Sequence, residues 1–274
     1  MRFELDSDQQ DFAGALDSLL ANADTVAVAR AWADGDHEPG LKLWGRLAEM
    51  GVTSLADEPV FLAIAFERLG YHAVPGPWVE SVAYLGQADG IATVALPPHV
   101  PYALDADVAG VPHVGAMRVS VDRTRRLFEV ETTDAVDEAA FDRAVLAVSA
   151  QLLGAGERVL ADSVTYVKQR KQFGREIGSY QAIKHALADV RIALDFARPL
   201  VLGAALGDVS VSAAKVACAD SAYLASRTGL QVHGAIGYTQ EFDLSLWLTK
   251  IRALVTAWGT PAHHRARLLE ALVD

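Results

Sequence analysis

Three segments of this chain carry polar, glycine and aromatic side chains at a density that suits ligand binding. They are Tyr166–Gly174, Gln231–Glu241 and Trp258–Thr260. An arginine grips a pyrophosphate through paired hydrogen bonds, and a neighbouring aromatic ring packs on a flat group. Glycines near Gln231 would let backbone amides approach such a ligand closely. These residue types suit a site for a phosphate-bearing ring ligand with Arg170 as its cation, but on their own they are explained at least as well by loop turns and a surface charge.

The histidines of the C-terminal part have simpler interpretations. His233 lies inside the second segment, where it would contact the ligand or fill its turn. His263 and His264 are adjacent in a basic last helix, and adjacent residues point to different sides of a helix. We therefore expect this pair to lie on the surface and to share no metal.

Cysteine and tryptophan side chains in this part are predicted to serve packing. Cys218 lies on an apolar helix face, as a buried packing residue would. Trp247 and Trp258 fall on a helical stripe over residues 244–258, so we expect them in the core or in an interface.

Helical periodicity predicts the N-terminal elements. A capping-box pattern at Ser7–Gln10 opens an amphipathic helix, a second helix ends at Gly51, and a third begins near Pro59 and ends at Gly70. Residues 1–86 are therefore predicted to form a helical domain.

The helical pattern returns after residue 134 and continues to the end of the chain. One apolar face marks a long helix that runs to about Arg170, and Pro199 interrupts or kinks the next helix. A third helix is expected over residues 211–228. It is followed by a fourth helix over residues 244–258, which carries Trp247 and Trp258, and by a short last helix. Four long helices predict an up-down bundle over residues 135–274.

The stretch between the two helical regions has the alternation of apolar and polar residues that is typical of β-strands. Met117, Val119 and Val121 alternate with polar residues before a turn, and Phe128 continues the alternation on a returning strand. This section, about 45 residues long, is too short for a freestanding sandwich of about seven strands. The expected fold is therefore mainly α with a small β middle section. The predicted domains are residues 1–86, 87–134 and 135–274.

Composition excludes several classes of function. The chain has 24 Lys and Arg against 35 Asp and Glu, a formal charge of −11, and a field of that sign repels phosphate backbones and anionic lipid. One cysteine makes neither an internal disulfide nor a zinc cluster. No apolar stretch reaches the roughly 20 residues of a membrane span, and the acidic start is unlike a signal peptide. We expect a cytoplasmic protein that binds no nucleic acid, membrane or metal.

The ligand-binding segments resemble those of the acyl-CoA dehydrogenase family. Arg170–Gly174, followed by Gln181 and the Leu-Ala-Asp run at 187–189, is similar to the family's R-x-[QT]-F-G, Q and L-A-D elements. Gln231–Glu241 is similar to its Q-x-x-G-G-x-G-[YF]-x-x-[DE] element, with Ala235 in place of the usual second glycine. Further likenesses cover residues 3–10, 44–51 and 67–70.

This resemblance implies a helical, β, helical fold in which the C-terminal bundle oligomerises and FAD lies across a subunit interface. Residues at the matching positions would hold the ADP half of an FAD whose flavin sits largely in the neighbouring subunit, with Gln181 in support. They are Arg170, Gln172, Phe173, Gln231, His233 and the backbone at Gly234 and Ala235. Thr260 would touch the flavin at this chain's own site. The implied partners are an acyl-CoA substrate and an electron-transfer flavoprotein.

The base for the family's reaction is missing from its usual positions. Dehydrogenation of an acyl thioester between its α and β carbons needs a carboxylate that reaches the α-proton, with a pKa raised by burial. Family members place this Glu directly before a Gly-Thr pair or on the preceding long helix, and here those positions are Trp258 and Ala144. The middle section also lacks counterparts of the family's T-E-P-x-A-G-S-D and W-I-[TS] segments.

We therefore interpret the chain as the partner subunit of an acyl-CoA dehydrogenase-type flavoprotein. In a mixed α2β2 assembly, Arg170, Gln172, Phe173 and Gln231 would complete the FAD site of a base-bearing chain, for oxidation of a steroid side-chain or fatty acyl-CoA. The alternative is a self-sufficient homo-oligomer with Glu241 as base, although an acid there also suits the first turn of the next helix. A flavin-free scaffold with the same fold is the third possibility.

Overall fold

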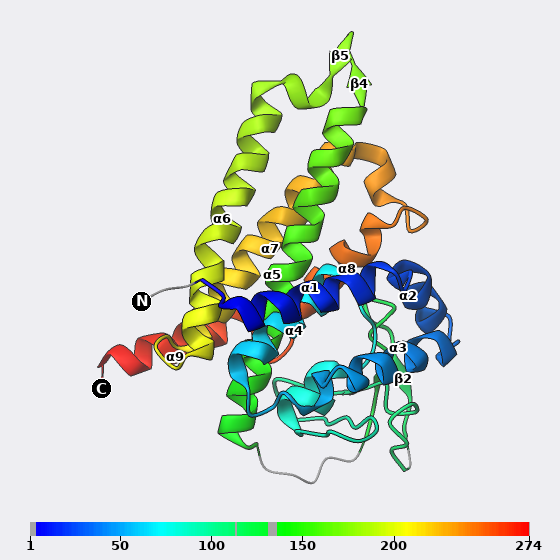
Figure 1. Ribbon diagram of the computed structural model, residues 1–274, viewed down its shortest axis with the longest axis vertical. Helices are drawn as coiled ribbons and strands as arrows, with labels where there is room; N and C mark the ends of the chain where they lie inside the picture. Colours follow the sequence, from blue (N-terminus) through cyan, green and yellow to red (C-terminus); the bar gives the residue numbers. More distant parts are fainter. Residues whose placement is uncertain (1–3, 113, 131–135, 274) are drawn as a thin grey trace.

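Helices make up most of the structure, a computed structural model that describes residues 4–112, 114–130 and 136–273. An N-terminal group of helices packs against the lower part of a C-terminal bundle, and a small β section lies beside the N-terminal group (Figure 1). The mainly α fold with a small β section is confirmed. Phe3, at the start of one predicted likeness, and the predicted boundary at residues 134–135 lie outside the described residues.

The N-terminal group consists of α-helices joined by short turns, together with a 3-10 turn and a π-helix. Its elements are α1 (Ser7–Ala21), α2 (Thr25–Ala33), α3 (Glu38–Glu49), η1 (Val52–Ser54), α4 (Pro59–Tyr71) and η2 (Val79–Tyr84). The helices predicted to end at Gly51 and to begin near Pro59 are confirmed as α3 and α4. Helix α2 was not predicted.

The first helix is capped one residue earlier than the sequence pattern predicted. Asp6, not Ser7, is the N-cap: its Oδ1 accepts a hydrogen bond from the backbone N–H of Gln9 at 2.9 Å. The Gln9 side-chain oxygen accepts in return from the Asp6 N–H at 3.1 Å. Asp6 and Gln9 have the same spacing as Ser7 and Gln10, so the sequence pattern alone allowed a capping box at either pair.

The β section is smaller than the alternation of valines predicted. Its strands are β1 (Ala103–Leu104), β2 (Met117–Arg118) and β3 (Leu127–Phe128), antiparallel in the order β1-β3-β2. Phe128 packs with Ala103 in a small separate core. The predicted strand at Met117 and its returning strand at Phe128 are confirmed as the antiparallel pair β2 and β3. The predicted extension through Val119 and Val121 is wrong, because β2 ends at Arg118 and these two valines lie beyond it, 99% and 55% exposed.

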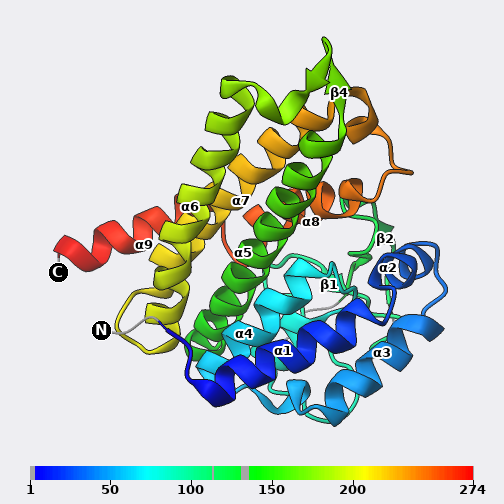
Figure 2. The same ribbon diagram turned by 45° about the horizontal axis from the view of Figure 1, so that its top comes forward.

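The C-terminal bundle is built on three long helices and a shorter fourth, which run alongside one another (Figures 1 and 2). Its elements are α5 (Glu138–Gln169), β4 (Lys171–Gln172), β5 (Arg175–Glu176), η3 (Ile177–Ser179), α6 (Gln181–Ala205), α7 (Val211–His233), η4 (Gly234–Tyr238), α8 (Leu244–Thr256) and α9 (Pro261–Val273). Helix α6 continues through Pro199 without interruption. Trp258 lies beyond the end of α8, in a turn, which corrects its placement on a helical stripe.

Helix α5 is the centre of the molecule, with α4, α6, α7 and α8 packed around it. It is long and apolar enough to cross a membrane by length and composition, but 83% of its most apolar window is buried inside the protein. Its apolar side chains therefore belong to the core. One continuous core runs from Leu47 and Phe66 of the N-terminal helices to Leu152 of α5 and Trp247 of α8.

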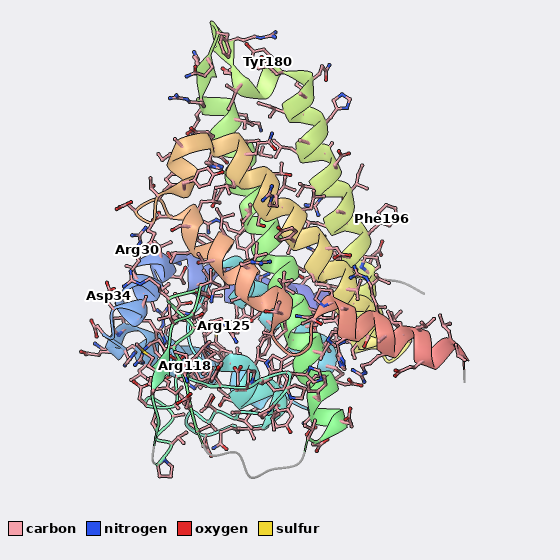
Figure 3. All side chains as sticks on the ribbon, turned by 180° about the vertical axis from the view of Figure 1, so that it is seen from behind. Arg30, Asp34, Arg118, Arg125, Tyr180 and Phe196 are labelled. Carbon is pink, nitrogen blue, oxygen red and sulfur yellow. The ribbon has the colours of Figure 1, made fainter. Side chains whose placement is uncertain are left out.

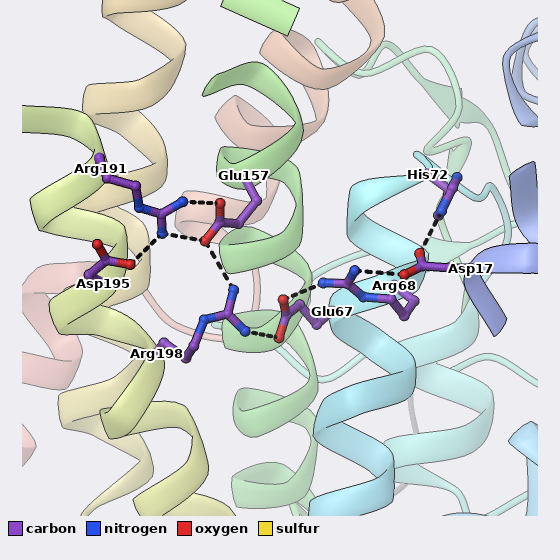
Figure 4. Close-up of polar contacts among 8 residues, drawn as sticks. All are labelled: Asp17, Glu67, Arg68, His72, Glu157, Arg191, Asp195 and Arg198. Carbon is purple, nitrogen blue, oxygen red and sulfur yellow. Dashed lines mark hydrogen bonds and ion pairs between the residues drawn. The ribbon is translucent and has the colours of Figure 1, made fainter. Parts of the chain in front are cut away.

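A chain of ion pairs ties the bundle to the N-terminal helices (Figure 4). Glu157 of α5 accepts from Arg191 at 2.6 Å and from Arg198 at 3.0 Å, both on α6. Arg198 also donates to Glu67 of α4 at 2.9 Å, and Glu67 is paired with Arg68. Asp17 of α1 then accepts from Arg68 at 3.1 Å and lies 2.9 Å from His72. Because these groups are partly buried, their charges are less screened than surface pairs.

Candidate cofactor site and the base position

Residues predicted to grip a cofactor gather at one end of the bundle, where α5 ends, α6 begins and α7 ends (Figure 1). Arg170 is the C-cap of α5, Gln172 is on β4, Gln181 is the first residue of α6 and Gln231 is near the end of α7. All four are exposed. Arg170 and Gln231, which are 61 residues apart in sequence, thus belong to helix ends that lie at the same end of the bundle.

The hairpin between β4 and β5 projects an aromatic ring into solvent. Its two-residue loop is Phe173 and Gly174, with φ of 52° and 79°, which is the conformation of a tight hairpin turn that favours Asn and Gly. Phe173 is 91% exposed. A phenylalanine in this backbone region, with its ring in water, gains nothing from this chain's own fold. Its ring is therefore placed to contact a ligand or another chain.

Neighbouring side chains hold the hairpin in place. The Arg175 guanidinium lies 3.9 Å from the centre of the Tyr180 ring, and the Tyr180 hydroxyl donates to the carbonyl of Gln172 at 3.5 Å. The Ile177 N–H donates to the Arg170 carbonyl at 2.9 Å. These contacts fix the backbone on both sides of the exposed ring.

Arg170 and the turn after α7 leave room for an anionic ligand. The Arg170 side chain is exposed and forms no ion pair within the described residues. Gly234 has a φ of 64°, and open space surrounds the position of a Cβ there, so a ligand can approach the backbone. Ala235, which follows, is also exposed. An unpaired arginine, an aromatic ring and open backbone fit the diphosphate and flat base of the ADP half of an FAD.

His233 is turned inward at the same end of the bundle. Its Nδ1 lies 2.7 Å from the Gly229 carbonyl, and its ring stacks on Tyr166 with centres 4.2 Å apart. Burial lowers the pKa of His233, which favours the neutral ring. Of its two predicted roles, filling the turn agrees with this geometry, and contact with a cofactor stays a prediction.

Thr260 lies in a different place, beside a cavity between the β section and the end of α8. We call this cavity of about 540 Å³ the Trp258 hollow, since Trp258, Thr260, Arg125 and Arg252 are among its lining residues. Thr260 Oγ1 accepts from the His263 N–H at 3.2 Å, as the cap of α9. The hollow shares no lining residue with the exposed end that carries Arg170.

Neither predicted base position holds a carboxylate. Trp258 is fully buried with φ of 57°, and Ala144 is fully buried within α5. Among the described residues that line the Trp258 hollow there is no Asp or Glu. The described lining of the hollow therefore presents no carboxylate to remove an α-proton.

Two buried polar side chains hold the Trp258 turn. His264 Nε2 lies 2.9 Å from the Trp258 carbonyl, and its Nδ1 lies 3.0 Å from Ser212 Oγ. Lys215 Nζ donates to the carbonyls of Leu254 at 2.6 Å and Ala257 at 2.9 Å. Burial lowers the pKa of His264 to about 4 and that of Lys215 to about 7.

The predicted surface position of His264 is therefore wrong, because the fold brings Ser212 of α7 against it. A neutral His264 can donate through Nε2 and accept through Nδ1, which satisfies both contacts. His263 is half-buried. Cys218 is fully buried, as predicted, and burial raises the pKa of its thiol to about 12.

Glu241 lies in the loop before α8. Its side chain is exposed, and its backbone carbonyl accepts from Arg30 of α2 at 2.8 Å. The same Arg30 nitrogen lies 2.7 Å from the Asp243 carboxylate. Glu241 is not among the residues that line the Trp258 hollow, so its use as a base stays a prediction.

Comparison with known proteins places this geometry in context. Residues 135–273 match the family described as acyl-CoA dehydrogenase, C-terminal domain. The chain is similar to the acyl-CoA dehydrogenase IpdE2 of Mycobacterium tuberculosis, with 28% identity over 93% of this chain and 90% of that protein.

Solved structures show the same fold at lower identity. Butyryl-CoA dehydrogenase from Megasphaera elsdenii superposes with a TM-score of 0.83 at 19% identity, over 100% of both chains. A chain of the ChsE4–ChsE5 complex from Mycobacterium tuberculosis superposes with a TM-score of 0.78 at 18% identity, over 100% of this chain and 99% of that one.

Proposed function

Because this chain belongs to the acyl-CoA dehydrogenase family, we propose that it is the subunit that completes the FAD site of a separate, base-bearing chain in a heterotetramer. One observation carries this proposal. Arg170 and Phe173 are both exposed at one end of the bundle, while Trp258 fills the position of the base elsewhere. A chain with exposed cofactor-binding residues and no carboxylate at either usual base position suits a supporting role.

Each predicted cofactor-binding residue would have its own role in this arrangement. Arg170 would pair with the diphosphate through its planar fork of donors. Phe173 would pack on a flat group or on the other chain, and Gln172 and Gln231 would offer amide hydrogen bonds. When bound, FAD supplies the acceptor for the hydride that leaves the acyl group. The base-bearing chain would supply the carboxylate that Trp258 and Ala144 do not.

The substrate class and partners follow from the resemblance and from one relative. The ChsE4–ChsE5 structure is described as a complex of two named proteins, which supports a heteromeric arrangement for this chain. We propose an acyl-CoA thioester with a steroid side chain or a fatty acyl group as the substrate, and an electron-transfer flavoprotein as the electron acceptor. A cytoplasmic location is part of the same proposal.

A visible absorbance spectrum tests the shared site. The chain is purified alone, and then together with a second dehydrogenase-like chain expressed from a neighbouring gene. A flavin band that is present only in the co-purified sample, and that bleaches with acyl-CoA, is the expected result. A stoichiometric flavin band in the chain alone, with full activity, would contradict the proposal. A colourless sample in both cases would favour the flavin-free scaffold.

A further inference from the structure

A second cavity lies where α4, α5 and α6 meet, and we call it the α4–α6 cavity. Its volume is about 210 Å³, whereas an apolar cavity of about 150 Å³ is large enough to take up benzene. It shares no lining residue with the Trp258 hollow. Its apolar lining residues are Leu5, Ala63, Ile64, Leu153, Val201 and Leu202.

The apolar wall of this cavity belongs to the core between the helices. Ala63 and Val201 are each 2% exposed, and Leu153 is fully buried. Helix α6 turns a different side to solvent, where it carries Phe196, which is 74% exposed (Figure 3). The cavity therefore lies on the inner side of α6, towards α4 and α5.

The two charged lining residues, Glu67 and Arg198, neutralise each other. Glu67 of α4 accepts from Arg198 of α6 at 2.9 Å (Figure 4). Glu67 also pairs with Arg68, and Arg198 donates in addition to Glu157 at 3.0 Å. Among the described lining residues, no buried polar side-chain atom lacks a hydrogen-bond partner. A water would therefore find few of the roughly two to four polar partners that hold a buried water.

This wall selects a neutral ligand. An anion would lie beside the Glu67 carboxylate and a cation beside the Arg198 guanidinium, and either charge would lose its water without gaining a free partner. A neutral apolar molecule needs no hydrogen bond, and it supplies dispersion contacts to the side chains around it. It would also join α4 of the N-terminal group to α5 and α6 of the bundle.

The entry side of the cavity is marked by two leucines. Leu5 and Leu202 are half-buried, and both also line a neighbouring surface hollow together with Val60 and Leu206. An apolar path thus leads from solvent to the cavity. Because Leu5 lies before α1 and outside any helix, its side chain can move aside without moving a helix.

We propose that the α4–α6 cavity binds a small, neutral, apolar molecule of about the size of a benzene ring, held by the apolar wall. The site goes beyond the proposed function, because its lining residues belong to this chain and none of them is a predicted cofactor-binding residue. Binding therefore needs neither FAD nor a partner chain.

Fluorine NMR of fluorobenzene, titrated with the purified chain, tests the site. Saturable binding of one fluorobenzene per chain is expected, and the melting temperature of the chain should rise with the ligand concentration. Benzene should compete for the same site. Benzoate and benzylamine keep the ring but carry a negative and a positive charge, so each should compete more weakly than benzene by roughly tenfold or more.

Substitutions that fill the cavity from two different helices locate the bound molecule. Ala63→Leu on α4 adds a branched alkyl group and should weaken fluorobenzene binding by roughly tenfold or more. Val201→Ile on α6 adds one methylene and should weaken binding less. Val190→Ile makes the same change on the same helix, at a residue that is 1% exposed and outside the cavity, and should leave binding unchanged. If Ala63→Leu does not fold, the two isoleucine variants still decide the location.

Two results would overturn this site. One is the absence of saturable fluorobenzene binding. The other is binding that neither Ala63→Leu nor Val201→Ile weakens, which would place the ligand elsewhere, for example in the Trp258 hollow. Competition by benzoate as strong as that by benzene would contradict the neutral ligand class. A colourless complex with the base-bearing chain contradicts the proposed function alone, because this titration uses the single chain.

Discussion

Gly154 of α5 lies so close to Glu67 of α4 that a Cβ on Gly154 would sit 1.9 Å from the Glu67 carbonyl oxygen. The same crossing is tight from the other side, where a Cβ on Gly70 would sit 2.1 Å from the Gln151 carbonyl. Backbone meets backbone at this crossing, which lets Glu67 reach Arg198 of α6. Only glycine fits at either position without moving a helix.

Gly154→Ala should therefore destabilise the protein by about 2–3 kcal/mol, as overpacking of a closed core does. The matched control is Gly14→Ala in α1, where nothing lies within 4 Å of the added Cβ. Because alanine favours a helix over glycine, that change should raise the free energy of unfolding by about 0.5–1 kcal/mol. Urea unfolding of both variants measures the difference, and equal effects would contradict the close crossing.

Arg170→Gln should weaken retention of FAD by the complex with the base-bearing chain. A hydrogen bond to a charged group contributes about 1.5–3 kcal/mol, so the loss of affinity should be roughly ten- to a hundredfold. Flavin content after gel filtration at several protein concentrations measures it. Arg46→Gln is the control, since Arg46 is exposed on α3. Unchanged flavin content with Arg170→Gln would remove Arg170 from the cofactor site.

Glu241→Gln discriminates the partner subunit from the self-sufficient enzyme. The Glu241 side chain is exposed and lies outside the Trp258 hollow, so we expect acyl-CoA to bleach the flavin of the variant complex at an unchanged rate. Stopped-flow absorbance gives that rate. Loss of bleaching with an unchanged melting temperature would instead identify Glu241 as the base.

Asp105 should make stability depend on pH near neutrality. It is fully buried, accepts from the Trp32 indole N–H at 3.0 Å and lies 3.9 Å from Arg126. Burial raises the pKa of Asp105 to about 7, whereas an unfolded Asp titrates near about 3.9. Between these values the folded state holds more protons, so its contribution to the free energy of unfolding falls as pH rises, by at most about 1.4 kcal/mol per unit.

Asp105→Asn removes this titration and keeps the acceptor for Trp32. Asparagine also tolerates the φ of 50° at this position. The melting temperature of the parent minus that of the variant should decrease from pH 5 to pH 7 and level off above pH 7. A constant difference over this range would show that Asp105 is charged throughout.

The helices and the family resemblance could be predicted from the sequence, because both depend on local patterns. The face that runs through Phe141 and Leu152 has helical spacing, and both residues are buried in α5. The resemblance is confirmed by the matching family. Helix α2 was missed because only three residues separate it from α1, and one amphipathic pattern covers both.

The β section could not be predicted in detail, because alternation indicates a strand only where one face is buried. Val119 and Val121 alternate with polar residues but are exposed. Residues that pair across long sequence distances were missed for a similar reason. Nothing local in the sequence relates Ser212 to His264, or Arg125 to Arg252, since the fold alone brings each pair to one place.

The roles of the predicted cofactor residues stay predictions, while their placement is a property of the fold. Arg170, Phe173 and Gln231 belong to elements at one end of the bundle, and Thr260 lies beside the Trp258 hollow. The sequence motif could indicate which residues belong together. It could not show that Phe173 points outward, because exposure depends on a hairpin that only the tertiary structure sets.

The shared core around α5 has a consequence for how the protein unfolds. Side chains of α4 and α5 belong to one continuous core, and the glycine crossing brings the backbones of the two helices into direct contact. A chain cut after Val130 would keep α4 but lose its supporting surface, so the fragment should aggregate rather than fold. Heating the intact chain should accordingly give one cooperative heat-absorption peak for the N-terminal helices and the bundle together.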